Sequence, residues 1–377
     1  MRIAFFAHSF ISDWNHGNAH FLRGIASELK SRGHEVLLFE PENSWSLSNL
    51  VRAQGEGVFK GYDEFFPDLK SRKYNLQEID LGKELDGVDL VIVHEWNHPE
   101  LVRRIGKYRR ALPRLRILFH DTHHRSVTAP SEMEDYDLSY YDGVLAFGKV
   151  VRDIYLEKSW IQKAWVWHEA ADIRTFKPIE TQKTDGDIAW IGNWGDDERT
   201  KELEEYLFKP VSTLGLRCAI HGVRYPDHAI SLLNNNGIEY RGWIANYMVP
   251  SLFSRFKMTV HIPRKPYVEK LPGIPTIRPF EALSCAIPLI CSPWDDCEKM
   301  FTEGEDYLMA RDGKEMKKLI LEVLNNQELR ESLATKGRNT ILQRHTCRHR
   351  VDELMDICSE IGIKIENNRS NNETRVI

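Results

Sequence analysis

The chain has 377 residues, of which 42% are hydrophobic, and its formal net charge is −5. This length and apolar content suffice for two domains of ordinary size, each with its own core. The acidic balance disfavours a dedicated nucleic-acid-binding protein, because such proteins present basic surfaces. The sequence shows no run of about 18 apolar residues and no secretory leader with a cleavage site, so we expect a cytoplasmic protein.

The first part of the chain alternates apolar strands with amphipathic helices. RIAFFAHS (2–9) is followed by a loop and by a helical pattern over 19–33, and four further strand patterns follow. Such alternation predicts a doubly wound parallel sheet. The four further strands are expected at EVLLFE (35–40), DLVIVHEW (89–96), RILFHDT (116–122) and GVLAFG (143–148).

A second series of strands begins after the polar, glycine-bearing segment 181–187, which we expect to be the linker. The fold prediction is therefore α/β, with two Rossmann-like doubly wound domains facing a cleft and C-terminal helices packing back toward the first domain. We place the first domain at 1–180, the second at 181–345, a helix at 346–363 and a mobile tail at 364–377. The strands of the second series are expected at DIAWIGNW (187–194), RCAIHGV (217–223), IEYRGWI (238–244), MTVHIP (258–263) and IPLIC (287–291).

No metal site or redox cofactor is expected. The six cysteines contain no CxxC pair and are expected to be free thiols. His120, His123 and His124 form an HxxHH run, but they have no glutamate partner that would suggest a metal site. Gly17 lacks the GxGxxG spacing of a dinucleotide-binding loop.

Two motifs carry a family resemblance. HDTHH (120–124) follows a first-domain strand, and RPFEALSCAIPLI (278–290) lies in the second domain. With the two doubly wound halves, they resemble glycosyltransferases of the GT-B fold, in the group-1, glycogen-synthase-like family of nucleotide-sugar transferases, and most of all its CgeB-like spore-maturation branch. The resemblance implies a hexosyltransferase-like Leloir enzyme that moves a sugar from a nucleoside diphosphate sugar to an unidentified acceptor, with retention and without an obligatory cofactor.

In the second domain the resemblance assigns Glu281 to the ribose hydroxyls of the nucleotide. The alternative is an acid in the first turn of a helix, where it complements the helix dipole. Gly273 stands where the family usually has another glutamate near the donor sugar. Backbone amides of Gly273, Ile274 and Thr276 are candidates to replace that contact, because glycine lets a ligand approach the main chain closely.

Cations are expected around the departing diphosphate, because its negative charge grows during transfer. The family's usual arginine after the first strand of the second domain is not in place, and that loop offers glycine and asparagine before its first arginine. The candidate residues for binding the nucleotide sugar are Arg264, Lys265, Arg278 and Arg199, together with Gly192 and Asn193 of the loop after that first strand.

In the first domain, His120 and Asp121 are expected to be catalytic, because they stand at the end of a strand, where loop residues face the cleft. His120 matches the family histidine near the donor sugar, and Asp121 orients it or contacts the acceptor. The alternative is a structural histidine. Gly17 is the counterpart of the family glycine that lets the backbone approach the donor phosphate or the acceptor.

The stretch VRRIGKYRRALPRLR (102–116) has seven cations among its fifteen residues. It is either a solvated helix face, or a contact with an anionic acceptor, or, from Arg103 to Arg116, a peripheral contact with anionic lipid at the inner membrane surface. The acceptor is expected to be a glycan, a lipid-linked molecule or a small molecule, and not a nucleic acid. Two alternatives to transfer are a nucleotide-sugar 2-epimerase of the same fold and a non-catalytic nucleotide-sugar-binding protein.

Overall fold

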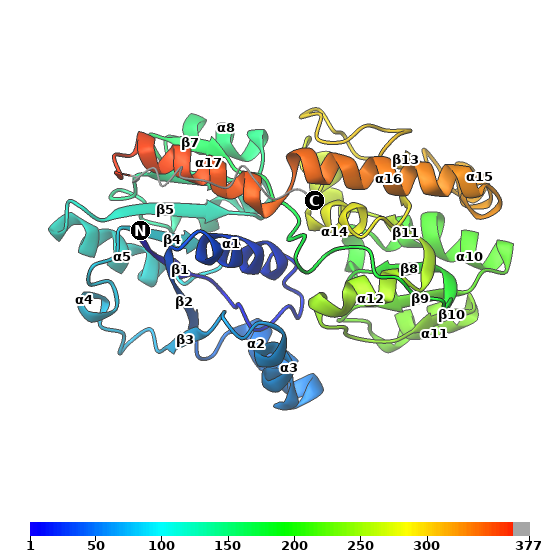
Figure 1. Ribbon diagram of the computed structural model, residues 1–377, viewed down its shortest axis with the longest axis horizontal. Helices are drawn as coiled ribbons and strands as arrows, with labels where there is room; N and C mark the ends of the chain where they lie inside the picture. Colours follow the sequence, from blue (N-terminus) through cyan, green and yellow to red (C-terminus); the bar gives the residue numbers. More distant parts are fainter. Residues whose placement is uncertain (365–377) are drawn as a thin grey trace, which may run out of the picture.

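The computed structural model describes residues 1–364, which form two separate parallel β-sheets lying side by side, each covered by helices (Figure 1). The first sheet has seven strands in the order β3-β2-β1-β4-β5-β6-β7. Its strands are β1 (Arg2–Phe6), β2 (Glu35–Pro41), β3 (Ser71–Tyr74), β4 (Leu90–His94), β5 (Arg116–Asp121), β6 (Gly143–Ala146) and β7 (Ala164–Val166).

The second sheet has six strands in the order β10-β9-β8-β11-β12-β13. In each sheet the strand order reverses beside the strand that comes first in the sequence, at β1/β4 and at β8/β11, and ligands of doubly wound folds bind at such switch points. The strands are β8 (Gly186–Ile191), β9 (Cys218–His221), β10 (Ile238–Tyr240), β11 (Phe256–His261), β12 (Leu289–Cys291) and β13 (Leu308–Met309).

Helices connect the strands and cover both sheets. Those that follow first-sheet strands are α1 (Ala19–Ser31), α2 (Trp45–Gln54), α3 (Gly57–Phe65), α4 (Leu81–Glu84), α5 (Pro99–Ala111), α6 (Arg125–Thr128), α7 (Pro130–Glu134) and α8 (Lys149–Glu157). The later ones are η1 (Asp196–Glu198), α9 (Thr200–Leu203), η2 (Glu204–Phe208), α10 (Lys209–Leu214), α11 (Asp227–Asn235), η3 (Asn246–Met248), α12 (Val249–Phe253), α13 (Lys265–Glu269), α14 (Ile277–Ser284), α15 (Gly313–Asn325), α16 (Gln327–Arg344) and α17 (Cys347–Glu360).

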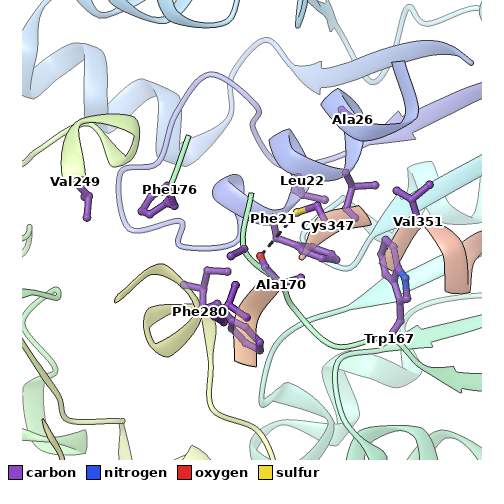
Figure 2. Packing of buried hydrophobic residues seen from close by; sticks show 14 of the residues in the cluster. Phe21, Leu22, Ala26, Trp167, Ala170, Phe176, Val249, Phe280, Cys347 and Val351 are labelled. Atoms are coloured by element: carbon purple, nitrogen blue, oxygen red, sulfur yellow. Dashed lines mark hydrogen bonds between the residues drawn. The ribbon is translucent and has the colours of Figure 1, made fainter. Parts of the chain in front are cut away.

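The last helix returns to the first half of the molecule. α16 runs along the second half, and α17 continues over the first half, where it packs on α1 (Figure 1). Figure 2 shows Trp167 beside α17, and its indole Nε1 donates to the carbonyl of Arg350 at 2.8 Å. A Cβ at Gly24 of α1 would lie 2.5 Å from Cys347 Sγ, so glycine is what permits this close approach. The predicted return of the C-terminal helices is confirmed.

The sequence predictions of the fold hold, with differences in detail. The predicted boundary at residue 180 falls between the end of β7 and the start of β8. Glu281 lies in the second turn of α14, so the alternative of a first-turn acid is wrong, because the helix already begins at Ile277. From residue 365 onward, the predicted mobile tail lies outside the described residues. Within residues 1–364, no helix is long and apolar enough to cross a membrane.

Candidate active site between the two sheets

A cavity of about 580 Å³ lies between the two halves of the molecule. The first half contributes loops that follow β1, β4, β5, β6 and β7, and also the first residue of α2. The second half contributes loops that follow β8, β9 and β11 and the N-terminus of α14. All of these segments lie at the carboxyl ends of parallel strands, where doubly wound folds bind ligands.

The second-half wall of the cavity carries four arginines, Arg199, Arg224, Arg264 and Arg278. Arg264 donates to Glu198 Oε2 at 2.7 Å, and Arg278 donates to Glu281. Arg199 donates to the carbonyls of Asn193 and Ile262 and to no carboxylate among the described residues. This wall therefore holds more positive charge than its own acids neutralise.

Arg199 shows the electrostatic cost of this arrangement. Burial and the nearby charges of Arg264 and Arg278 lower the pKa of Arg199 to about 9, although Tyr225 and Glu198 act in the opposite direction. Like charges are brought together in this way where an anionic ligand compensates them. The cluster is therefore suited to a phosphate or diphosphate group.

The N-terminus of α14 points its backbone amides toward the same region, because Thr276, Ile277 and Arg278 all line the cavity. The positive end of the helix dipole favours an anion there. Thr276, the residue before the helix, has φ +59°, which is unusual for a β-branched side chain. Backbone strain of this kind concentrates at ligand-binding positions. Gly17 approaches this helix end, and a Cβ there would lie 3.2 Å from Ile277.

The first-half wall carries no Lys or Arg side chain among the residues described. Four histidines line it instead, and burial lowers the pKa of each, to about 4 for His8, about 3 for His16 and about 2 for His123, and below its ordinary value for His124. At neutral pH these imidazoles are uncharged. The two walls of the cavity therefore differ sharply in charge.

Glu169, which follows β7, contributes a carboxyl group to the first-half wall. Its Oε1 accepts a hydrogen bond from Asn18 Nδ2 at 2.9 Å. Burial raises the pKa of Glu169 to about 7; Glu281 adds to this effect, whereas Asn18 and Arg278 oppose it. A carboxyl group with a pKa near neutrality can both accept and release a proton at physiological pH.

Seven of the sequence-predicted site residues line this cavity: Gly17, Gly192, Asn193, Arg199, Arg264, Thr276 and Arg278. They come from both halves of the chain, and Asn193 Nδ2 donates across the gap to Asn15 Oδ1 at 2.6 Å. The other six, His120, Asp121, Lys265, Gly273, Ile274 and Glu281, lie outside the lining.

The predicted catalytic pair lies beneath the cavity. His120 and Asp121 have no exposed surface, because β5 continues through Asp121 and keeps both side chains within the packed sheet. The ring of His120 packs against Trp167, and both of its nitrogens lack a partner among the described residues. Asp121 accepts from Tyr155 Oη at 2.9 Å and from the backbone N–H of His123 at 3.0 Å. The next residues of the loop, including His123, reach the cavity instead.

Glu281 is also fully buried. Its Oε1 accepts from His20 Nδ1 at 3.0 Å and from Asn246 Nδ2 at 2.6 Å, and its Oε2 accepts from Arg278. Burial raises the pKa of Glu281, but the charge of Arg278 and the bonds from His20 and Asn246 outweigh this effect and lower it overall. The carboxylate thus holds a cavity-lining arginine in place.

The remaining three predicted residues support the interface between the halves or lie outside it. A Cβ at Gly273 would lie 2.6 Å from Cγ of Glu298, whose carboxylate accepts from His168 Nε2 at 3.0 Å in the first half. Ile274 packs closely on Gly148, because a Cβ added to Gly148 would lie 2.4 Å from Cγ1 of Ile274. Nζ of Lys265 lies 3.9 Å from Oε1 of Glu202.

Six further residues that line the cavity carry no motif that predicted a role for them: Glu169, His8, His261, Trp45, Trp96 and Arg224. The acid within AWVWHEAA (164–171) was a usable signal for Glu169, because a carboxylate is rare in such an apolar run. The others stand at strand ends or at a helix start without a motif.

The basic stretch 102–116, which covers most of α5 and ends on the first residue of β5, is largely engaged within the protein. Arg103 pairs with Glu100, and Arg109 pairs with Asp142 at 3.0 Å. Arg104 donates to the carbonyls of Leu76 and Ile79, whereas Arg116 donates to those of Pro113 and Ile361. Four of its seven cations thus have partners in the fold.

Comparison with known proteins agrees with this architecture. Residues 199–356 match a family model described as glycosyl transferase-like. No curated protein matched the sequence significantly. Within residues 1–364, no group of three or more His, Cys, Asp or Glu side chains is placed to hold a metal ion.

Solved structures match over nearly the whole chain. Anabaena HepE in complex with UDP and glucose superposes with a TM-score of 0.68 at 12% identity, covering 96% of this chain and 100% of that one. A glycosyltransferase from Rickettsia africae superposes with a TM-score of 0.66 at 13% identity, covering 96% of this chain and 98% of that one. T4 phage BGT in complex with UDP-glucose superposes with a TM-score of 0.60 at 13% identity, covering 96% of this chain and 100% of that one. The chain therefore has the two-domain GT-B fold of glycosyltransferases.

Proposed function

We propose that the protein is a glycosyltransferase that moves a sugar from a nucleoside diphosphate sugar to an acceptor bound in the same cavity. The observation that carries the proposal is the incompletely neutralised group of Arg199, Arg264 and Arg278 beside the N-terminus of α14. Structures of the same fold with UDP and glucose, such as that of Anabaena HepE, support a nucleotide sugar as the ligand.

The donor diphosphate would bind the arginine-bearing wall. Arg199, Arg264, Arg278 and the amides that begin α14 would stabilise the negative charge that grows on the diphosphate as it leaves. Gly192 and Asn193 would contact the nucleotide from the same wall, and Gly17 would let the first-half backbone approach the phosphate. Glu281 would act on the nucleotide through Arg278, which it holds at the cavity.

The reaction breaks the bond between C1 of the sugar and the phosphate oxygen, and forms a bond between C1 and an acceptor hydroxyl oxygen. With retention of configuration, which the family resemblance implies, the acceptor proton passes to the departing phosphate. No nucleophile of the protein is required. Glu169 would hydrogen-bond a sugar hydroxyl at the reacting centre, because its carboxyl group lies on the first-half wall.

His120 and Asp121 would act as positioning residues. Asp121 accepts from the backbone N–H of His123 and so fixes the loop that brings His123 and His124 to the cavity. A role of this kind agrees with the complete burial of both side chains. The resemblance to the CgeB-like branch, a cytoplasmic location and peripheral membrane contact through Arg103 to Arg116 are further parts of the proposal.

Isothermal titration calorimetry and thermal shift with UDP-, GDP-, ADP- and CMP-sugars test the proposal. A ligand at about 100 times its Kd should add about 2.7 kcal/mol to the free energy of unfolding. Product analysis by NMR then distinguishes transfer from epimerisation and reports the anomeric configuration. A protein that binds none of these nucleotides would contradict the proposal, and one that binds without turnover would favour the non-catalytic alternative.

A further inference from the structure

Two exposed tryptophans stand at the first-half wall of the cavity. All ten tryptophans lie within the described residues, and only Trp45 and Trp96, 49% and 41% exposed, are among the exposed large hydrophobic side chains. Both line the cavity. Leaving two indole rings in water is unfavourable, and such exposure concentrates at ligand-binding surfaces.

Each ring is held by its neighbours rather than left loose. Trp14 packs edge-on against Trp45, with 5.0 Å between ring centroids and 72° between the planes. Arg125 lies over the ring of Trp96, with 4.3 Å from its guanidinium carbon to the ring centroid, and Arg125 in turn pairs with Glu95. The two indoles are thus rigid platforms, and a rigid platform loses little entropy when a ligand stacks on it.

His8 lies beside Trp96 and next to the start of α2, the helix that begins with Trp45. Its ring centroid is 6.5 Å from that of Trp96, and its Nε2 accepts from the backbone N–H of Ser46, the residue after Trp45, at 3.2 Å. Because a backbone N–H can only donate, Nε2 is unprotonated and the proton of the neutral ring is on Nδ1. Nδ1 makes no hydrogen bond within the described part of the chain. It is a free donor at the cavity.

We infer that Trp45, Trp96 and His8 form the acceptor subsite and that the acceptor is a neutral carbohydrate, an inference that rests on the proposed transferase function. Aromatic faces pack against the C–H faces of pyranose rings, and one oriented donor binds a hydroxyl oxygen. The charges select against anionic acceptors, because the arginines lie on the second-half wall and the first-half wall has no Lys or Arg among the described residues. Arg125, behind Trp96, is already paired with Glu95.

A glycan array probed with the labelled full-length protein in the presence of UDP tests this inference. Neutral oligosaccharides should bind, and Trp45→Ala and Trp96→Ala should each weaken that binding about tenfold or more. Trp45→Phe should restore part of it, because the aromatic face remains. Leu321→Ala, which removes another exposed apolar side chain outside the cavity lining, is the control and should have no effect.

Calorimetry with UDP alone separates this inference from the proposed function. UDP affinity should be unchanged in both tryptophan variants, because the nucleotide is assigned to the opposite wall. Loss of UDP binding in these variants would mean that the indoles hold the nucleobase and would overturn the inference. It would equally fail if the wild type binds UDP but binds no neutral glycan, or instead prefers a short duplex DNA. Failure of the wild type to bind any nucleotide would overturn the proposed function itself.

Discussion

The imidazole of His20, on α1, donates a hydrogen bond to the carboxylate of Glu281, on α14, with 3.0 Å between Nδ1 and Oε1. Nε2 of the same ring accepts from the backbone N–H of Asp172 at 2.8 Å, so the ring is the neutral tautomer with its proton on Nδ1. Both side chains are almost completely buried. This bond ties the two halves together beside the cavity.

Replacing Glu281 by glutamine should destabilise the protein and weaken nucleotide binding. The carboxylate accepts from three donors, His20, Asn246 and Arg278, whereas an amide has one acceptor oxygen and leaves at least one buried donor unpaired. We expect a loss of about 1–3 kcal/mol in the free energy of unfolding, measured in urea. Glu303→Gln, at a partly exposed ion pair with Arg311, is the control. An unchanged unfolding midpoint would contradict this assignment.

Replacing Arg199 by methionine should reduce nucleotide affinity without lowering the stability of the free protein by a comparable amount. The substitution removes a charge that Arg264 and Arg278 oppose, and it removes a donor to the diphosphate. We expect UDP binding to weaken by about 1.5–3 kcal/mol in calorimetry.

The control for this substitution is Arg311→Met, a cation outside the cavity lining, which should leave UDP affinity unchanged. Equal UDP affinity of the Arg199 variant and the wild type would remove this arginine from the anion site. The difference in UDP affinity between the wild type and the Arg199 variant should also shrink as the salt concentration rises, because salt screens the attraction between the arginines and the diphosphate.

Replacing Glu169 by glutamine should change how stability depends on pH. The pKa of Glu169 rises from an ordinary 4.5 to about 7 in the folded protein, so between these values the native state binds more protons than the unfolded state. The contribution of this group to stability is therefore fully present below about pH 4.5 and is lost as the pH rises toward 7.

Glutamine mimics the protonated acid, so the stability of the variant relative to wild type should rise between about pH 5 and about pH 8 and be constant above that range. Urea unfolding of both proteins across this range measures the difference. Glu331→Gln, at an exposed surface position, should show no such slope. A pH-independent difference for Glu169→Gln would show that the carboxyl group is ionised throughout.

Replacing Gly24 by alanine should weaken the packing of α17 on α1. The added Cβ would lie 2.5 Å from Cys347 Sγ and 2.7 Å from Asp172 Cβ, and two backbones would have to separate to accommodate it. Overpacking of this kind costs about 1–3 kcal/mol. Gly57→Ala in α3 is the matched control, because a Cβ there meets nothing within 4 Å. If thermal unfolding gives both variants the same stability, the tight contact between the helices is not what Gly24 provides.

The sequence alone determined the two doubly wound halves and the sheet edge at which folds of this kind bind ligands. Apolar runs such as LVIV (90–93) are long enough to require burial on both faces, and the alternation with helices leaves a parallel sheet as the solution. The edge strand SRKY (71–74) was missed because it has no such pattern and pairs on one side only.

The tertiary structure decided which strand-end residues reach the cavity. Strand patterns place His120, Asp121 and His123 equally near the end of β5. In the structure, His120 and Asp121 still pair with β6, and the chain reaches the cavity only after this pairing stops, at residues such as His123. Glu281 is buried because His20, more than two hundred residues earlier, packs against it. Hydrophobic periodicity depends on neighbours along the chain. The burial of Glu281 and the exposure of Trp45 and Trp96 depend instead on how the two separate sheets meet.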